Sequence, residues 1–208
     1  MAKGKEIERK WRLGTTNTAA IDELIGSFGS PTLINQVYLD PSGLGGRPFI
    51  QLDLPDGTTW EYAPPDWAGE VLAGGPGAVR VRRKQRNSTA VPSFMLTIKS
   101  KGSVERDEHE HDLSQVQAEL LIACGILGKP VVKHRFVNPA PGEKPFELDI
   151  FSGELDGLIL LEKEFVSLAA AKAFVLPDIF DVFDPVDVSE DPDYGNFNLA
   201  QNGLPVAA

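Results

Sequence analysis

Cysteine is nearly absent from this chain of 208 residues: Cys124 is the single one, which excludes an intramolecular disulfide and a cysteine-rich zinc site. Positive charge is also scarce, and the net charge of −10 argues against general affinity for nucleic acid. The chain has no apolar run long enough to span a bilayer and no apolar signal segment at its start. We therefore expect a cytoplasmic protein without nucleic-acid or membrane partners, and no pattern specifies its oligomeric state.

Apolar residues are plentiful enough for one large domain over residues 1–208, since 42% of the chain is hydrophobic. Alternation of apolar and polar residues predicts eight strands, over 5–13, 33–40, 79–84, 93–101, 104–113, 131–137, 145–151 and 157–165. Helical spacing of apolar residues predicts three helices, over 18–28, 114–127 and 167–175. Ser114 and Gln117 form a capping-box pattern at the start of the second helix.

Residues 41–78 differ from the rest of the chain in their density of glycine and proline, which suits loops. Two alternating stretches, 49–54 and 58–62, flank Asp56-Gly57, a dipeptide typical of a hairpin turn. We interpret this segment as an inserted β-hairpin outside the main body, and we expect that a short linker can replace it without unfolding the protein. The C-terminal segment, residues 177–208, is acidic and contains no lysine or arginine.

The first predicted strand places Glu6, Glu8 and Lys10 at alternate positions. Side chains of the same parity recur about every 6.6–6.8 Å along one face of a strand. Two carboxylates at that spacing can hold a hard divalent cation, and the lysine beside them can hold the anion that the cation brings. A solvated strand face of mixed charge is the alternative interpretation of this stretch alone.

The same alternation of charge returns in the later strands, which makes a merely solvated face harder to accept. Basic residues share a face at Arg80 and Arg82, at Lys99, and at Lys133 and Arg135. Acidic residues share a face in three strands, at Glu108 and Glu110, at Glu147 and Asp149, and at Glu162 and Glu164. If these faces converge inside a barrel, the charges must be paired or ligand-bound. A polyphosphate with magnesium fits such a lining, because basic groups bind phosphate oxygens and carboxylates bind the metal.

The stretch Glu6-Ile7-Glu8-Arg9-Lys10 resembles the ExExK signature of the CYTH, or triphosphate tunnel metalloenzyme, superfamily. Further segments resemble motifs of its short bacterial tripolyphosphatase-type members, in the same order along the chain. They are Gln36-Val37-Tyr38-Leu39, Val79-Arg80-Val81-Arg82, Leu96-Thr97-Ile98-Lys99, Lys133-His134-Arg135, Glu147–Phe151, Gly157–Glu164, and Asp191–Tyr194 with Asn198–Ala200. ExExK alone is a weak signal, but ordered matches over most of the chain are a strong one. Residues 41–78 depart from the family pattern, because short members have only a few residues there.

The resemblance implies an α+β fold: an eight-stranded antiparallel β-barrel that forms a closed or nearly closed tunnel, with flanking helices. It implies Mg²⁺ or Mn²⁺ as cofactor, with Asp149 near the carboxylates that hold it, Glu6, Glu8, Glu162 and Glu164. It implies basic ligands for a triphosphate-containing small molecule: Lys10, Arg80, Arg82, Lys99, Lys133 and Arg135. In short bacterial members the lysine of ExExK pairs with the tyrosine of QxYL, here Lys10 with Tyr38. Strand parity adds Glu108, Glu110 and Glu147 as further candidate tunnel carboxylates.

The resemblance implies metal-dependent hydrolysis of inorganic triphosphate, by attack of water on a terminal phosphoryl group. We expect Lys10, an ammonium near metal and other cations, to be pressed towards its neutral form and to orient or deprotonate that water, with Tyr38 holding the amine. The alternatives are hydrolysis of a nucleoside or thiamine triphosphate, class IV adenylyl cyclase chemistry, and a non-catalytic module that binds a triphosphate. The motifs bind the triphosphate and not what is attached to it, so they do not rank these substrates.

Overall fold

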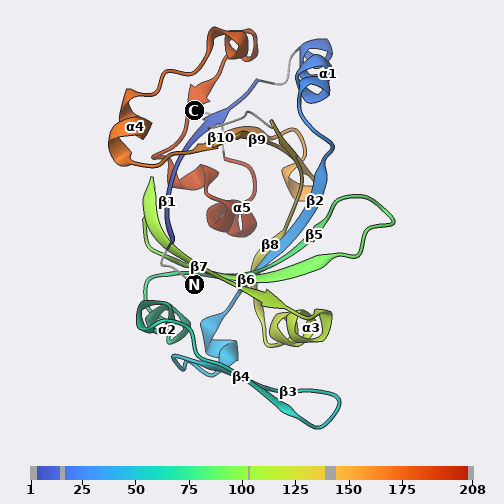
Figure 1. Cartoon of the computed structure of the whole chain (residues 1–208), viewed down its shortest axis with the longest axis vertical. Helices are drawn as coiled ribbons and strands as arrows, with labels where there is room; N and C mark the ends of the chain where they lie inside the picture. The colour runs from blue at the N-terminus through green and yellow to red at the C-terminus, as the bar shows by residue number, and fades with distance from the viewer. Residues whose placement is uncertain (1–3, 15–16, 103, 139–143, 206–208) are drawn as a thin grey trace.

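The structure, a computed structural model, describes residues 4–14, 17–102, 104–138 and 144–205. Its main feature is an antiparallel sheet whose last strand pairs back with its first. Round the ring, the strands are β1 (Gly4–Arg12), β7 (Glu105–Leu113), β6 (Ser93–Ser100), β5 (Gly77–Gln85), β2 (Thr32–Leu39), β8 (Ile126–Val137), β9 (Phe146–Ser152) and β10 (Ile159–Glu164). Because β10 pairs with both β9 and β1, the sheet is a closed eight-stranded barrel, as predicted (Figure 1).

Alternation along each strand separates the two faces of the barrel wall. On β5, Val79 and Val81 belong to a hydrophobic cluster on the outside, whereas Arg80 and Arg82 form ion pairs with β7 across the inside. The charged residues that alternate in the sequence are therefore brought together in the interior. The same alternation gives the outer face its apolar residues, which helices then cover.

One side of the barrel is covered by α3 (Gln115–Ala123) and by the segment between β2 and β5. That segment contains η1 (Pro41–Leu44), a separate hairpin of β3 (Ile50–Asp53) and β4 (Thr59–Tyr62), and α2 (Asp66–Leu72). Figure 1 shows the hairpin outside the ring of strands. Its buried Ile50, together with Ala68 and Leu72 of α2, packs in one cluster with Leu96 and Ile98 of β6. The insertion thus lies outside the barrel, and its apolar side chains belong to the core.

The other side of the barrel is covered by α1 (Thr18–Ser27), α4 (Leu168–Ala173) and η3 (Asp178–Phe183). Leu24 of α1 and Phe180 of η3 pack in a cluster with Trp11 of β1, Phe136 of β8 and Leu161 of β10. After η3, the short strand β11 (Val186–Asp187) pairs with the end of β1. The chain then enters the interior of the barrel.

The last helix, α5 (Asn196–Asn202), lies within the ring of strands (Figure 1). It follows η4 (Pro192–Tyr194), and its buried Leu199 and Ala200 pack with Val131 of β8 and Leu160 of β10. Gly128 of β8 permits this close approach, because a Cβ there would lie 2.3 Å from the carbonyl oxygen of Ala200. The helix therefore fills one end of the barrel interior.

Several boundaries differ from those predicted. The helix expected over 114–127 ends at Ala123, because Gly125 takes a positive φ of 136° and β8 begins at Ile126. Helix α2 was not predicted, since glycine and proline surround it and Gly69 lies within it. Gly77 and Ala78, placed in the inserted segment from the sequence, belong to β5. Residues 206–208 of the predicted C-terminal segment lie outside the described residues. No helix in the described part of the chain is long and apolar enough to cross a membrane.

Candidate active site

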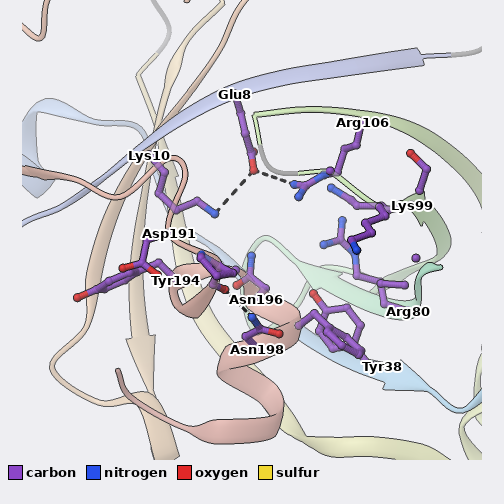
Figure 2. Close-up of a pocket in the computed structure, with 18 of the residues that line it drawn as sticks. Glu8, Lys10, Tyr38, Arg80, Lys99, Arg106, Asp191, Tyr194, Asn196 and Asn198 are labelled. Carbon is purple, nitrogen blue, oxygen red and sulfur yellow. Dashed lines mark hydrogen bonds and ion pairs between the residues drawn. The ribbon is translucent and has the colours of Figure 1, made fainter. Parts of the chain in front are cut away.

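A cavity of about 610 Å³ lies in the barrel interior, beside the segment that leads into α5. Residues of β1, β2, β5, β6 and β7 form one part of its wall, and residues from Val188 to Asn198 form the other. Its charged lining from the strands consists of Glu8, Lys10, Arg80, Lys99 and Arg106. Figure 2 shows these side chains directed towards one space from different strands, as the alternation predicted.

On the β5–β7 side of the barrel, the basic groups meet carboxylates from β1 and β7. Lys99 Nζ lies 2.7 Å from Glu6 and 3.2 Å from Glu108. Arg80 reaches Glu108 only at 3.6 Å, and its Nε has no hydrogen-bond partner among the described residues. Arg82 is the most loosely paired, at 3.9 Å from Glu110. Several N–H groups on this side are therefore not committed to a carboxylate.

On the β8–β10 side, the charges form a close network. Lys133 donates to Asp149, a carboxylate with no exposed surface. Arg135 donates to Asp149 at 2.6 Å, to Glu162 at 2.5 Å, and to Glu147 as well. Hydrogen bonds join all five side chains, so each buried charge has a partner of opposite sign.

Lys10 of β1 lies at the junction of the two sides. Its Nζ is 2.9 Å from Glu162 and 3.7 Å from Glu8 (Figure 2 shows the second contact). Burial lowers the pKa of Lys10, but the negative charges of Glu162 and Glu8 outweigh burial and raise the pKa above its ordinary value. In this arrangement the two glutamates favour the charged form of Lys10, and the expectation that a nearby cation presses it towards its neutral form stays a prediction.

The expected pairing of Lys10 with Tyr38 is not formed in this structure. The buried Tyr38 hydroxyl is close enough to Arg80 for a hydrogen bond, and its ring meets Phe197 of α5 edge to face at 5.1 Å. Lys10 Nζ instead pairs with the two glutamates, so the described contacts include no bond between the two side chains. Burial raises the pKa of Tyr38, although the charge of Arg80 opposes this effect. The catalytic roles of Lys10 and Tyr38 remain predictions.

The predicted metal ligands lie on two paired strands. In the register of β1 and β10, Glu8 is opposite Glu164 and Lys10 is opposite Glu162. Carboxylate oxygens suit Mg²⁺ and Mn²⁺, so the residues fit such a cation in type and in strand position. In the described part of the chain, however, no three carboxylate or imidazole groups form a preformed cluster. Glu164 is partly exposed and pairs with Lys144 at 2.8 Å, and each of the other carboxylates has a basic partner from the tunnel.

The remaining candidate carboxylates are also paired. Glu108 meets Arg80 and Lys99, and Glu110 meets Arg82. Burial raises the pKa of Glu147, although Arg135 opposes this effect. These carboxylates balance basic groups in the tunnel, and their proposed role as tunnel carboxylates is consistent with that position.

Arg106 is a tunnel residue that we did not include among the predicted ligands. It donates to Glu6 at 2.6 Å and to Glu8 at 2.8 Å, and so it joins the two carboxylates of the first strand. Its parity with Glu108 and Glu110 already indicated an inward position. The wall formed by Asp191 to Asn198 was signalled only by the resemblance of that segment to the family, because nothing in its pattern shows that it enters a barrel.

A second cavity, of about 400 Å³, lies outside the tunnel between the insertion and β7. There the hydroxyl of Tyr62 is hydrogen-bonded with His109, and the Tyr62 ring stacks on His111 with 4.1 Å between centroids. These contacts fasten the inserted hairpin to the outer face of β7, whose inner face carries Arg106 and Glu108.

Comparison with known proteins agrees with this geometry. No family model matches the sequence. The chain is 34% identical over 154 residues to the inorganic triphosphatase of Nitrosomonas europaea, which covers 74% of this chain and 94% of that protein. The crystal structure of the inorganic triphosphatase NE1496 superposes with a TM-score of 0.50 and 26% identity, over all of this chain and 99% of the other. A second structure, of the hypothetical protein NE1496, gives a TM-score of 0.51 and 27% identity over 96% of this chain and 99% of the other. The closed barrel, its charged interior and this identity over nearly the whole relative show that the chain belongs to the CYTH, or triphosphate tunnel metalloenzyme, family.

Proposed function

We propose that this protein is a metal-dependent inorganic triphosphatase, which hydrolyses tripolyphosphate inside the barrel. The observation that carries the proposal is the interior itself: basic residues from β1, β5, β6 and β7 line one cavity together with Glu8. Lys10 connects this cavity, through Glu162 of β10, to Arg135 of β8. A polyphosphate carries negative charge along its whole length, so several basic side chains can bind it at once. The identity with an inorganic triphosphatase supports the same substrate.

The basic residues have two different parts in this proposal. Arg80 and Arg82 bind phosphate oxygens directly, since their donors are the least committed to carboxylates. Lys99 binds phosphate after giving up part of its contact with Glu6 and Glu108. Burial and the nearby Arg80 and Arg106 charges lower the pKa of Lys99, and an arriving polyanion relieves that repulsion. Lys133 and Arg135 bind phosphate after giving up part of their contact with Asp149 and Glu162.

Glu6, Glu8, Glu162 and Glu164 are the residues that would hold Mg²⁺ or Mn²⁺, with Asp149 behind them. A divalent cation at such a site polarises phosphoryl oxygens and makes bound water a better nucleophile. Lys10, between Glu8 and Glu162, is placed to bind a phosphate oxygen or to orient the attacking water once these glutamates bind elsewhere. Tyr38 closes this part of the cavity wall beside Arg80.

Release of phosphate from three substrates tests the proposal: tripolyphosphate, ATP and thiamine triphosphate, each with Mg²⁺, with Mn²⁺ and with excess EDTA. We expect turnover of tripolyphosphate with a cation and none with EDTA. Faster turnover of ATP or thiamine triphosphate would assign an organic triphosphate as substrate, and formation of cyclic AMP from ATP would assign cyclase chemistry. Full activity in EDTA would contradict the metal requirement, and binding without any turnover would leave a triphosphate-binding module.

A variant links the activity to the carboxylates. Glu162→Gln removes the charge that Lys10 and Arg135 share, so we expect loss of turnover in a protein that still folds. Glu154→Gln is the matched control, because Glu154 forms an exposed pair with Lys129 on the surface. Retained turnover in Glu162→Gln would exclude Glu162 as a ligand of the cation.

A further inference from the structure

Gln36 of β2 has a polar side chain that is buried without hydrogen-bond partners among the described residues. Its side chain is only 1% exposed, yet neither its amide nitrogen nor its amide oxygen has a hydrogen-bond partner in the described part of the chain. A buried amide without partners costs about 1–3 kcal/mol in stability. A protein rarely keeps such a group at a buried position unless a ligand or another partner completes it.

The position of Gln36 points into the tunnel. In the register of β2 and β5, Gln36 is opposite Arg82, and Tyr38 is opposite Arg80. Tyr38 and Arg80 line the cavity, so their neighbours of the same parity face the same interior. Gln36 is not among the residues that line the cavity, and its register opposite Arg82 places it one inward position further along β5 than Arg80.

Arg82, opposite Gln36, offers hydrogen-bond donors that complement the Gln36 amide. Its Nε is also buried without a partner among the described residues, and its nearest carboxylate, Glu110, is 3.9 Å away. A guanidinium offers only donors, whereas an amide offers both a donor and an acceptor. Gln36 can therefore accept from Arg82 through Oε1 and still donate through its NH₂ group.

We propose that Gln36 is a further triphosphate-binding residue: its NH₂ group donates to a phosphate oxygen held by Arg82, and its Oε1 accepts from Arg82 Nε and orients the guanidinium. This inference rests on the proposed function and deepens it. Because Gln36 lies one inward position further along than Arg80, it binds the phosphate that reaches furthest along the tunnel. Binding of tripolyphosphate should therefore depend on this residue more than binding of pyrophosphate does.

Gln36→Met tests this role, because methionine keeps the volume and removes both polar atoms. We expect an unchanged or raised melting temperature without ligand, and a kcat/KM for tripolyphosphate with Mg²⁺ lowered about tenfold or more, the usual effect of losing a hydrogen bond to a charged group. The rise in melting temperature that tripolyphosphate gives should shrink in the variant, whereas the rise with pyrophosphate should stay. Gln36→Glu places an anion beside the phosphate and should lower kcat/KM further.

Asn35→Leu is the matched control, since Asn35 is the neighbouring amide on the exposed face of the same strand. Wild-type protein without turnover of tripolyphosphate would overturn the proposed function. Active wild-type protein with an equally active Gln36→Met variant would overturn the role of Gln36 alone. An equal loss of stabilisation by tripolyphosphate and pyrophosphate would also overturn it, because it would show general loosening of the tunnel.

Discussion

The two sides of the barrel interior hold the same kinds of charge in different ways. On the β8–β10 side, Arg135 donates to three carboxylates, and Asp149 beside it has no exposed surface. On the β5–β7 side, Arg80 and Arg82 lie 3.6 and 3.9 Å from their carboxylates and keep Nε groups without partners among the described residues. The first side is neutralised within the protein, whereas the second has donors left over. The second side is therefore prepared for an anion before one arrives.

Both sides of the barrel are packed on their outer faces, the β8–β10 side by residues of α1 and η3. The outer face of β5 and β6 is covered by α2, α3 and the inserted hairpin, with Leu72, Leu96 and Ile98 fully buried. Apolar packing on that face keeps these strands in place, so their inner side chains need not form tight ion pairs to order the wall. This arrangement lets a binding surface keep free donors without losing its shape.

Arg135→Met should have the largest effect on stability. Removal of this guanidinium leaves Asp149, Glu147 and Glu162 with too few cations in a buried network, which costs about 3–5 kcal/mol. Urea unfolding measures the change. Lys129→Met is the control, because its exposed pair with Glu154 should contribute no more than about 1 kcal/mol. Equal stability of Arg135→Met and wild type would mean that the buried network contributes no more to the free energy of unfolding than a surface ion pair does.

Leu72→Ala tests the external support of the β5–β7 side. Leu72 is fully buried between the insertion and the barrel, so its truncation should destabilise the protein by about 2–5 kcal/mol. The KM for tripolyphosphate should rise as well, because β5 carries Arg80 and Arg82. Val91→Ala, at an exposed position, should change stability by less than about 0.5 kcal/mol. An unaffected Leu72→Ala would support replacement of the insertion by a linker, which stays a prediction.

Arg80→Met should affect binding more than folding, in contrast to Arg135→Met. Loss of one arginine–phosphate contact corresponds to about 1.5–3 kcal/mol, or about a ten- to hundredfold fall in kcat/KM for tripolyphosphate. The loss of stability should stay below that of Arg135→Met. Arg83→Met, on the outer face of the same strand, is the control and should leave kcat/KM unchanged. If Arg80→Met lost as much stability as Arg135→Met, the two sides of the barrel interior would not differ in how far their ion pairs stabilise the fold.

Asp187→Asn should have the smallest effect, and it concerns the strand that leads to the cavity wall. Burial raises the pKa of Asp187, but hydrogen bonds from Ser189 and Arg9 outweigh burial and lower it below its ordinary value. Its stabilising contribution is therefore present above the unfolded pKa of about 3.9 and is lost as the pH falls through the lower folded pKa.

The Asp187 contribution should stay under about 1 kcal/mol, because the carboxylate is partly exposed and screened by solvent. Unfolding of wild type and Asp187→Asn should therefore differ at pH 6, and the difference should shrink only as the pH falls below about 3.9 towards the lower folded pKa. Asp178→Asn, at an exposed position of η3, is the control. A difference that persists at low pH would show that the pairing with Arg9 is not its source.

Strand parity predicted much of the site, because alternation decides which side chains enter a barrel whatever its detailed geometry. The resemblance then identified the barrel and its basic residues. The ion pairs between the tunnel residues were not predictable. Lys10 lies opposite Glu162, for example, because of the register between two strands that are far apart in sequence. The place of α5 inside the ring was not predictable either, because a short helix with no clear apolar stripe resembles a loop in sequence.

The pairing of β1 with β10 and β11 has a consequence for how the chain folds. The backbone N–H of Lys10 bonds to Ser189, 179 residues further on, and the carbonyl of Lys10 accepts from Val188. Because the ends of a long loop must meet before such contacts form, we expect these contacts to form late in folding. During synthesis, the first strand emerges long before the residues that will flank Lys10 and complete the cavity wall. A shortened chain that ends before Val188 would therefore lack these partners of Lys10 and one wall of the cavity.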